Sequence, residues 1–147
     1  MSWKKETVEI NKRRKLAKAQ GGKEAIKIQH DKGRLTLRER IELLLDKGTF
    51  QEQGEIAGGV ETDSEGKLES VTPANFILGF GKINNQQVVV GGEDFTVKGG
   101  SPNAAGLRKS VYTEELALKY KVPLIRLHEG GGGSVAGPGK KSGSYGG

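Results

Sequence analysis

The chain has 147 residues, a formal net charge of +6, no cysteine and two histidines. These numbers exclude disulfides, thiolate metal sites and a cysteine nucleophile, and the two histidines form no His-x-x-x-His pair, so no metal site is expected. There is no apolar run of membrane-spanning length and no signal-peptide core, which predicts a cytoplasmic protein with no membrane partner. Glycine, at 24 residues, leaves few side chains for a core, so we expect a domain that needs neighbours or is part of a longer chain.

Positive charge is concentrated in the first part of the chain. Residues 1–40 hold 13 Lys/Arg against 5 Asp/Glu, a net +8, whereas the remainder has a net charge of −2. A basic arm is typical of polyanion binding, but Trp3 is its only aromatic residue and no nucleic-acid-binding motif is present. Nucleic-acid binding is therefore a minor alternative to a solvated helix face that docks on an acidic partner.

Residues 1–50 are predicted to form a helical arm. Strong helix formers dominate residues 4–20 and 23–32, and glycines follow both segments. Thr36 and Glu39 have the spacing of a capping box, which predicts a third helix ended by Lys47-Gly48. Its apolar positions are 37, 41, 44 and 45.

The middle of the chain differs in character from the arm. A polar loop is predicted at residues 61–67. Residues 76–83 and 86–92 are rich in strand formers and are separated by Asn84-Asn85, which tolerates the positive φ of a tight turn. The sequence therefore predicts a β-hairpin.

A helix and a further strand follow the hairpin. Ser101 and Pro102 resemble an N-cap and first helical residue, which predicts a helix over about residues 102–121. Apolar side chains at 107, 111 and 118 share one face of it, and residues 124–127 are apolar enough for an inner strand. The order strand, strand, helix, strand is a ββα unit and predicts an α/β fold.

Two glycine-containing loops are candidates for chemistry. Lys98-Gly99-Gly100-Ser101 precedes the predicted helix, where free N–H groups and Lys109 two turns along could bind an anion; a plain helix cap is the alternative. Residues 130–147 contain nine glycines, typical either of a flexible linker or, after a buried strand, of backbone amides that stabilise an oxyanion.

Nearby polar side chains give weaker signals. His128 could act as a base, although a structural role is the commoner one at a strand end, and Glu129 is a similarly weak candidate. Asp94 is predicted to cap a turn.

The segment Gln29–Phe50, QHDKGRLTLRERIELLLDKGTF, resembles the opening of the carboxyltransferase (beta) subunits of biotin-dependent acyl-CoA carboxylases. The similarity continues through the hairpin and Asp94–Ser101 to the glycines at 130–133, and covers roughly residues 25–135. In that family the last motif is Asp-Ser-Gly-Gly-Ala-Arg, whereas residues 128–133 read His-Glu-Gly-Gly-Gly-Gly, which loses an arginine.

The resemblance implies a crotonase-like (ClpP/crotonase) fold, a superhelix of ββα units. Residues 51–147 would be the first part of an N-terminal carboxyltransferase domain. The family moves a carboxyl group from carboxybiotin, on a carrier protein or domain, to the α-carbon of an acyl-CoA, in homo-oligomers that work with a biotin carboxylase subunit.

Site residues carried over by motif are Gly99, Gly100, Ser101 and Lys109 near the coenzyme A, with Gly131 and Gly132 as backbone oxyanion donors. A chain of this length is expected to be catalytically incomplete by itself, because members of the family are several times longer. The alternative is a non-catalytic CoA-binding or assembly module.

Overall fold

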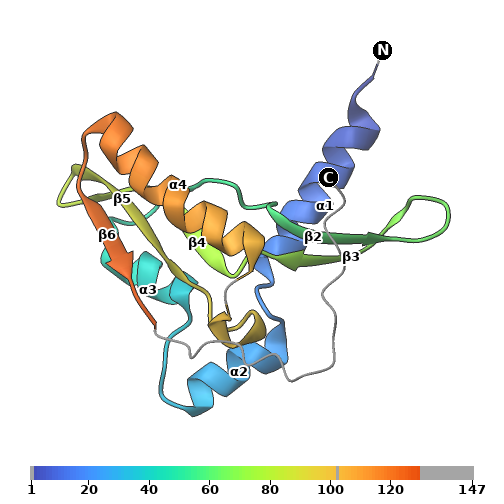
Figure 1. Cartoon of the computed structure of the whole chain (residues 1–147), viewed down its shortest axis with the longest axis horizontal. Helices are drawn as coiled ribbons and strands as arrows, with labels where there is room; N and C mark the ends of the chain where they lie inside the picture. The colour runs from blue at the N-terminus through green and yellow to red at the C-terminus, as the bar shows by residue number, and fades with distance from the viewer. Residues whose placement is uncertain (1, 102, 130–147) are drawn as a thin grey trace.

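The computed structural model describes residues 2–101 and 103–129 (Figure 1). The elements in chain order are α1 (Lys4–Lys18), α2 (Lys23–Asp31), α3 (Leu37–Leu44), β1 (Gln51–Glu52), β2 (Gly58–Thr62), β3 (Leu68–Pro73), β4 (Phe76–Ile83), β5 (Gln86–Glu93), a 3-10 turn (Lys98–Gly100), α4 (Ala104–Tyr120) and β6 (Leu124–Leu127).

The three predicted helices of the arm are confirmed. Gly22 (φ 92°) and Gly33 (φ 69°) occupy left-handed backbone positions beside the breaks between them, where a side chain would be strained. Thr36 forms the predicted capping box: its Oγ1 accepts the Glu39 N–H at 3.4 Å, and its own N–H donates to Glu39 Oε2 at 2.7 Å. The arm therefore follows local sequence signals closely.

The main sheet has the strand order β1-β4-β5-β6. β4 and β5 form the predicted antiparallel hairpin around Asn84 (φ 49°) and Asn85 (φ 64°), and β6 returns parallel to β5 after α4, which confirms the ββα unit (Figure 1). The prediction of an inner strand at 124–127 is wrong for the described residues: β6 is at the sheet edge and half-buried. Both faces of β6 are covered, because Leu124 packs against one core of the sheet and Ile125 and Leu127 pack against the other.

Helices cover both faces of this sheet (Figure 1). The side chains of β4 and β5 alternate between the faces, so each strand contributes to two cores. The core toward α3 contains Leu37, Ile41, Leu45, Ile77, Val88 and Val90. The core toward α4 contains Phe76, Leu78, Val89, Leu116 and Ala117.

A second hairpin, β2–β3, was not anticipated. The predicted polar loop at 61–67 is its tip: Asp63 Oδ1 accepts the N–H groups of Glu65 and Lys67 at 2.9 and 2.8 Å. All five residues of β2 are exposed, so the strand lacks the apolar alternation by which a strand is recognised. β3 packs against α1, and the green hairpin extends away from the main sheet in Figure 1.

The start and the buried face of α4 differ from prediction. The N-cap is Asn103, whose side chain accepts the Gly106 N–H at 2.7 Å, and not Ser101; Pro102 lies outside the described residues. The predicted apolar stripe Leu107, Val111 and Leu118 is 56%, 57% and 81% exposed. The sheet instead meets Gly106, Lys109, Thr113, Leu116 and Ala117, of which only Leu116 is a large apolar side chain.

No helix among residues 2–101 and 103–129 is both long and apolar enough to cross a membrane.

Candidate functional site

The predicted glycine loop is a tight turn ahead of α4. Its residues have left-handed φ values of 51° at Lys98, 60° at Gly99 and 72° at Gly100. The Gly100 N–H donates to the Val97 carbonyl at 3.1 Å and the Ser101 N–H to the Lys98 carbonyl at 3.2 Å, so two expected donors are used within the turn. Lys98 and Gly99 are exposed, and a Cβ at Gly99 would meet nothing within 4 Å. The accessible part of the loop is therefore Lys98-Gly99.

Buried neighbours fix the base of this loop. The Phe95 ring covers Gly100, where an added Cβ would lie 2.5 Å from a ring carbon. Asn75 donates from its side-chain amide to the Ser101 carbonyl, and Asp94 Oδ1 accepts the N–H and hydroxyl of Thr96 at 3.0 and 2.6 Å, the predicted turn cap. Burial raises the pKa of the Asp94 carboxyl, against the opposing hydrogen bonds from Thr96. Contacts of Phe95, Asn75 and Asp94 thus fix the backbone at the beginning and at the end of the turn.

The helical arm also reaches this turn. The Gly21 N–H donates to Thr96 Oγ1 at 2.9 Å, and a Cβ at Gly21 would lie 1.7 Å from the Thr96 carbonyl oxygen. Only glycine permits that approach, so the α1–α2 junction is coupled directly to the loop that precedes α4.

Lys109 lies inside the fold. The residue is 7% exposed, and its Nζ donates to the Gly54 carbonyl at 3.2 Å. Burial lowers the pKa of Lys109 to about 8, although Glu52 opposes the shift. The Lys109 ammonium therefore binds the segment after β1. Lys109 lies two helical turns along α4 from the glycine loop, although the sequence pattern grouped it with that loop.

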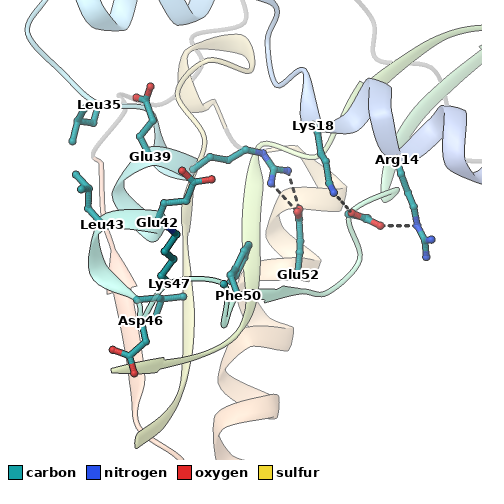
Figure 2. A pocket seen from close by; sticks show the side chains of 14 residues that line it. Arg14, Lys18, Leu35, Glu39, Glu42, Leu43, Asp46, Lys47, Phe50 and Glu52 are labelled. Carbon is teal, nitrogen blue, oxygen red and sulfur yellow. Dashed lines mark hydrogen bonds and ion pairs between the residues drawn. The ribbon is translucent and has the colours of Figure 1, made fainter. Parts of the chain in front are cut away.

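A groove of 1410 Å³ lies along α3 and β1 and beside α1 (Figure 2). Within it, Arg38 holds Glu52 through two hydrogen bonds of 2.7 and 3.0 Å, and both side chains are largely buried. Arg14 and Lys18 of α1 converge on Glu55 at 2.6 and 3.8 Å. Sequence reasoning missed these pairings, because no periodicity links residues from separate elements.

The carboxyl end of β6 brings further charges together. His128 is exposed, and its Nδ1 lies 3.5 Å from Glu93 Oε1. Glu129 faces Arg34 and Arg40, each at 3.7 Å. Gly131 and Gly132, the predicted oxyanion donors, lie outside the described residues. Within the part of the chain that the structure describes, no group of three or more His, Cys, Asp or Glu could hold a metal ion.

Known proteins are similar to this chain in sequence. Residues 28–144 match the carboxyl transferase domain model. The propionyl-CoA carboxylase beta chain of Cereibacter sphaeroides is 36% identical over 127 residues, covering 86% of this chain and 25% of its own. The human mitochondrial propionyl-CoA carboxylase beta chain is 34% identical over 132 residues, 86% of this chain and 24% of its own. The chain thus spans about a quarter of the length of these relatives.

Solved structures share the fold. Transcarboxylase 12S, described as a hexamer and solved with hydrolysed methylmalonyl-coenzyme A, matches with a TM-score of 0.75 and 30% identity over 92% of this chain and 27% of its own. The beta subunit of P. aeruginosa geranyl-CoA carboxylase matches with a TM-score of 0.60 and 25% identity over 90% of this chain and 23% of its own. These matches confirm the predicted crotonase-like α/β fold as a partial domain with a helical N-terminal region. The chain belongs to the carboxyl transferase domain family.

Proposed function

We propose that this chain forms the acyl-CoA-holding part of a carboxyltransferase subunit of a biotin-dependent acyl-CoA carboxylase. The whole reaction moves the carboxyl group of carboxybiotin to the α-carbon of the acyl-CoA. The observation that supports this most is the family match over residues 28–144, which covers α3, the ββα unit and the glycines at 130–133. The division into an arm at 1–50 and a domain start at 51–147 is part of the proposal, although α3 packs into the sheet core.

The proposed binding element for coenzyme A is the turn before α4. Lys98 offers an exposed positive charge, and Gly99 leaves open space beside it. Coenzyme A carries phosphates, which bind to lysine and to exposed backbone N–H groups. Gly100 and Ser101 support this surface by closing the turn, and Lys109 supports it from within by fixing α4 to Gly54.

The proposed chemical role belongs to backbone amides. Gly131 and Gly132 would donate their N–H groups to the oxygen of the thioester carbonyl as an enolate develops, and removal of one such donor costs about 3 kcal/mol of transition-state stabilisation. Carboxybiotin supplies the carboxyl group when its carrier is bound. The resemblance assigns its pocket to the junction between the N-terminal domain of one subunit and the C-terminal domain of another, so the proposed partners are a biotin carrier or biotin carboxylase subunit and further copies of the chain.

A charge-matched pair of variants tests the CoA proposal. Gly99→Asp and Gly99→Asn introduce side chains of nearly equal size that both tolerate the left-handed backbone at φ 60°. We expect Gly99→Asp to weaken propionyl-CoA binding by about tenfold relative to Gly99→Asn, because a carboxylate beside the phosphates costs roughly 1.4 kcal/mol. Isothermal titration of the whole chain measures this. Equal affinities of the two variants would exclude the turn as the phosphate site.

Activity separates the proposal from a non-catalytic CoA-binding module. When this segment replaces the aligned 127 residues of the Cereibacter sphaeroides propionyl-CoA carboxylase beta chain, we expect carboxyl transfer to propionyl-CoA to be retained. A chimaera that folds and binds propionyl-CoA without transfer would favour the binding module instead.

A further inference from the structure

Thr96 is buried where the helical arm meets the loop that precedes α4, and it is 6% exposed. Its hydroxyl donates to Asp94 Oδ1 at 2.6 Å and accepts the Gly21 N–H at 2.9 Å. A threonine hydroxyl has one hydrogen to donate, so the bond to Asp94 fixes its direction and leaves a lone pair for Gly21. The side chain of Thr96 thus joins the residue after β5 to the junction of α1 and α2.

Asp94 anchors this chain of hydrogen bonds to the sheet. It is 2% exposed, its own N–H donates to the Asn75 carbonyl at 2.9 Å, and its carboxylate also accepts the Thr96 N–H at 3.0 Å. Asn75 directly precedes β4, so Asp94 is held at the open end of the central hairpin. Thr96 is therefore bound to the sheet on one side and to the arm on the other.

Gly21 of the arm also contacts the main chain of Thr96. An added Cβ at Gly21 would lie 1.7 Å from the Thr96 carbonyl oxygen and 2.4 Å from its carbonyl carbon. A larger residue would force the two backbones apart, and the hydrogen bond to the Thr96 hydroxyl would be lost as they separate. The arm and residue 96 thus meet through one polar and one steric contact, and both depend on the glycine.

One residue separates Thr96 from the turn. Val97 is 3% exposed, and its carbonyl accepts the Gly100 N–H at 3.1 Å. Lys98 follows with φ 51°, a left-handed conformation that a lysine keeps only where its surroundings enforce it. Because Thr96 and Val97 are both buried, the contacts of Thr96 set the place of the Lys98 backbone. The exposed pair Lys98-Gly99 thus depends on a buried hydroxyl group two residues earlier in the chain.

We propose that Thr96 is a positioning residue for coenzyme A, whose hydroxyl fixes the turn Lys98–Ser101 against the arm at Gly21. The inference rests on the proposed function, in which that turn binds the phosphates of coenzyme A. It adds that the arm, through its contact with Thr96, determines how tightly coenzyme A is bound. The physical reason is that a turn already held in place pays less ordering cost when the ligand binds.

The first test variants change only the Thr96 hydroxyl. Thr96→Val keeps the shape and leaves the Gly21 N–H without its acceptor, whereas Thr96→Ser keeps the hydroxyl. Thr113→Val is the matched control. Thr113 is 0% exposed, and its hydroxyl donates to the Lys109 carbonyl at 2.7 Å within α4, away from the arm.

Amide hydrogen exchange of the whole chain, followed by NMR, measures the effect on the turn. The reporters are the N–H groups of Gly21, Gly100 and Ser101. The reference is Val89, which is 0% exposed in β5. We expect Thr96→Val to accelerate exchange at the reporters about tenfold relative to the reference, the factor that corresponds to one buried hydrogen bond. Thr96→Ser and Thr113→Val are expected to stay within about twofold of wild type.

A change in the arm tests the same contact from its other end. Gly21→Ala introduces the Cβ that meets the Thr96 carbonyl. Its control is Gly59→Ala in the exposed strand β2, where the nearest non-adjacent atom would lie 4.0 Å from the new Cβ. We expect Gly21→Ala, and not Gly59→Ala, to accelerate exchange at Gly100 and Ser101 relative to the reference, although the turn itself is unchanged.

Isothermal titration of the same samples with propionyl-CoA measures the consequence for binding. We expect Thr96→Val and Gly21→Ala to weaken binding about fivefold, and Thr96→Ser to restore it to within about twofold of wild type. Thr113→Val is expected to bind as the wild type does, which separates loss of this hydroxyl from loss of any buried hydroxyl. Thr96→Val keeps the residue volume, so it decides both measurements if Gly21→Ala does not fold.

The outcomes separate this inference from the proposed function. Equal acceleration at the reporters and at Val89 would show a general loss of stability and would overturn the positioning role. Unchanged affinity in Thr96→Val, with a wild type that binds, refutes only this inference. A wild type that does not bind propionyl-CoA, with exchange rates as expected, refutes the proposed function and leaves the contact between Thr96 and the arm standing.

Discussion

Arg38 and Glu52 form a two-pronged ion pair that joins α3 to β1, with N–O distances of 2.7 and 3.0 Å and side chains only 19% and 8% exposed. The planar guanidinium matches the carboxylate, so both of its oxygens are satisfied at once. Lys109 lies near the same pair and is affected by the charges of both residues. Helix α3, β1 and α4 therefore meet at one buried group of charges.

Removal of one member of this pair is expected to be strongly destabilising. Arg38→Met leaves the Glu52 carboxylate buried without its partner, which costs about 3 to 5 kcal/mol of unfolding free energy. The double variant Arg38→Met/Glu52→Gln removes both charges and is expected to be more stable than Arg38→Met alone. Urea unfolding of the four proteins in this cycle measures the coupling, and additive losses would contradict a direct pairing.

The lowered pKa of Lys109 is expected to make the free energy of unfolding vary with pH in the alkaline range. Its pKa is about 8 in the folded chain against 10.5 for the unperturbed side chain, so between these values the unfolded chain carries a proton that the folded chain lacks. Stability is therefore expected to rise as pH increases through this interval, by about 3 kcal/mol in total. Lys109→Met removes that contribution. The measurement is the difference in unfolding free energy between wild type and Lys109→Met at pH 7.5 and pH 10, and a difference independent of pH would contradict the shifted pKa.

Gly106→Ala should destabilise the chain in spite of its place in a helix. Alanine is normally favoured over glycine in a helix interior by about 1 kcal/mol. At Gly106, however, an added Cβ would lie 2.1 Å from Asn75 Oδ1. The amide nitrogen of the same Asn75 side chain donates to the Ser101 carbonyl. We expect a lower melting temperature for Gly106→Ala, and a smaller effect of the same substitution when Asn75 is replaced by alanine. A melting temperature raised by Gly106→Ala alone would contradict this expectation, because it would show that the Asn75 side chain moves away from the new methyl group without loss of stability.

The capping box at the start of α3 is expected to contribute measurably to the free energy of unfolding. Thr36→Ala removes the oxygen that accepts the Glu39 N–H and is expected to cost about 1 kcal/mol of unfolding free energy, whereas Thr36→Ser keeps that oxygen and most of the stability. Chemical denaturation distinguishes the two variants. Equal losses would assign the effect to the methyl group of Thr36, which is 2% exposed, and not to the cap.

Glu39 is expected to make the stabilisation by this capping box depend on pH. Its pKa is lowered, first by the Thr36 backbone N–H and then by the His30 side chain. A carboxylate with a lowered pKa stabilises the fold above its unfolded value of 4.5, and that contribution is lost as pH falls through the folded value. We expect Glu39→Gln to reduce stability at pH 7 and to have little effect in strong acid, as measured by urea unfolding at both pH values.

The sequence by itself determined the elements whose signals are local. The Thr36–Glu39 capping box, the glycines that end the helices and the Asn84-Asn85 turn each act within a few residues, so the arm and the central hairpin could be predicted. The motif at residues 29–50 also indicated the family, because its residue types stand in a long and specific order. The hairpin β2–β3 was missed because all five residues of β2 are exposed, so that strand carries no apolar alternation.

The tertiary structure alone decided which side chains meet. Leu107, Val111 and Leu118 form an apolar stripe, yet α4 turns Gly106 and Thr113 to the sheet, where a Cβ added at Gly106 would lie 2.1 Å from Asn75 Oδ1 and one added at Gly91 would lie 3.0 Å from Thr113 Cγ2. Lys109 is buried on that same face, which its position in the helix could not reveal. The pairings of Arg38 with Glu52 and of Glu129 with Arg34 and Arg40 join residues 14 to 95 positions apart, and such distances in sequence are closed only by the packing of the sheet.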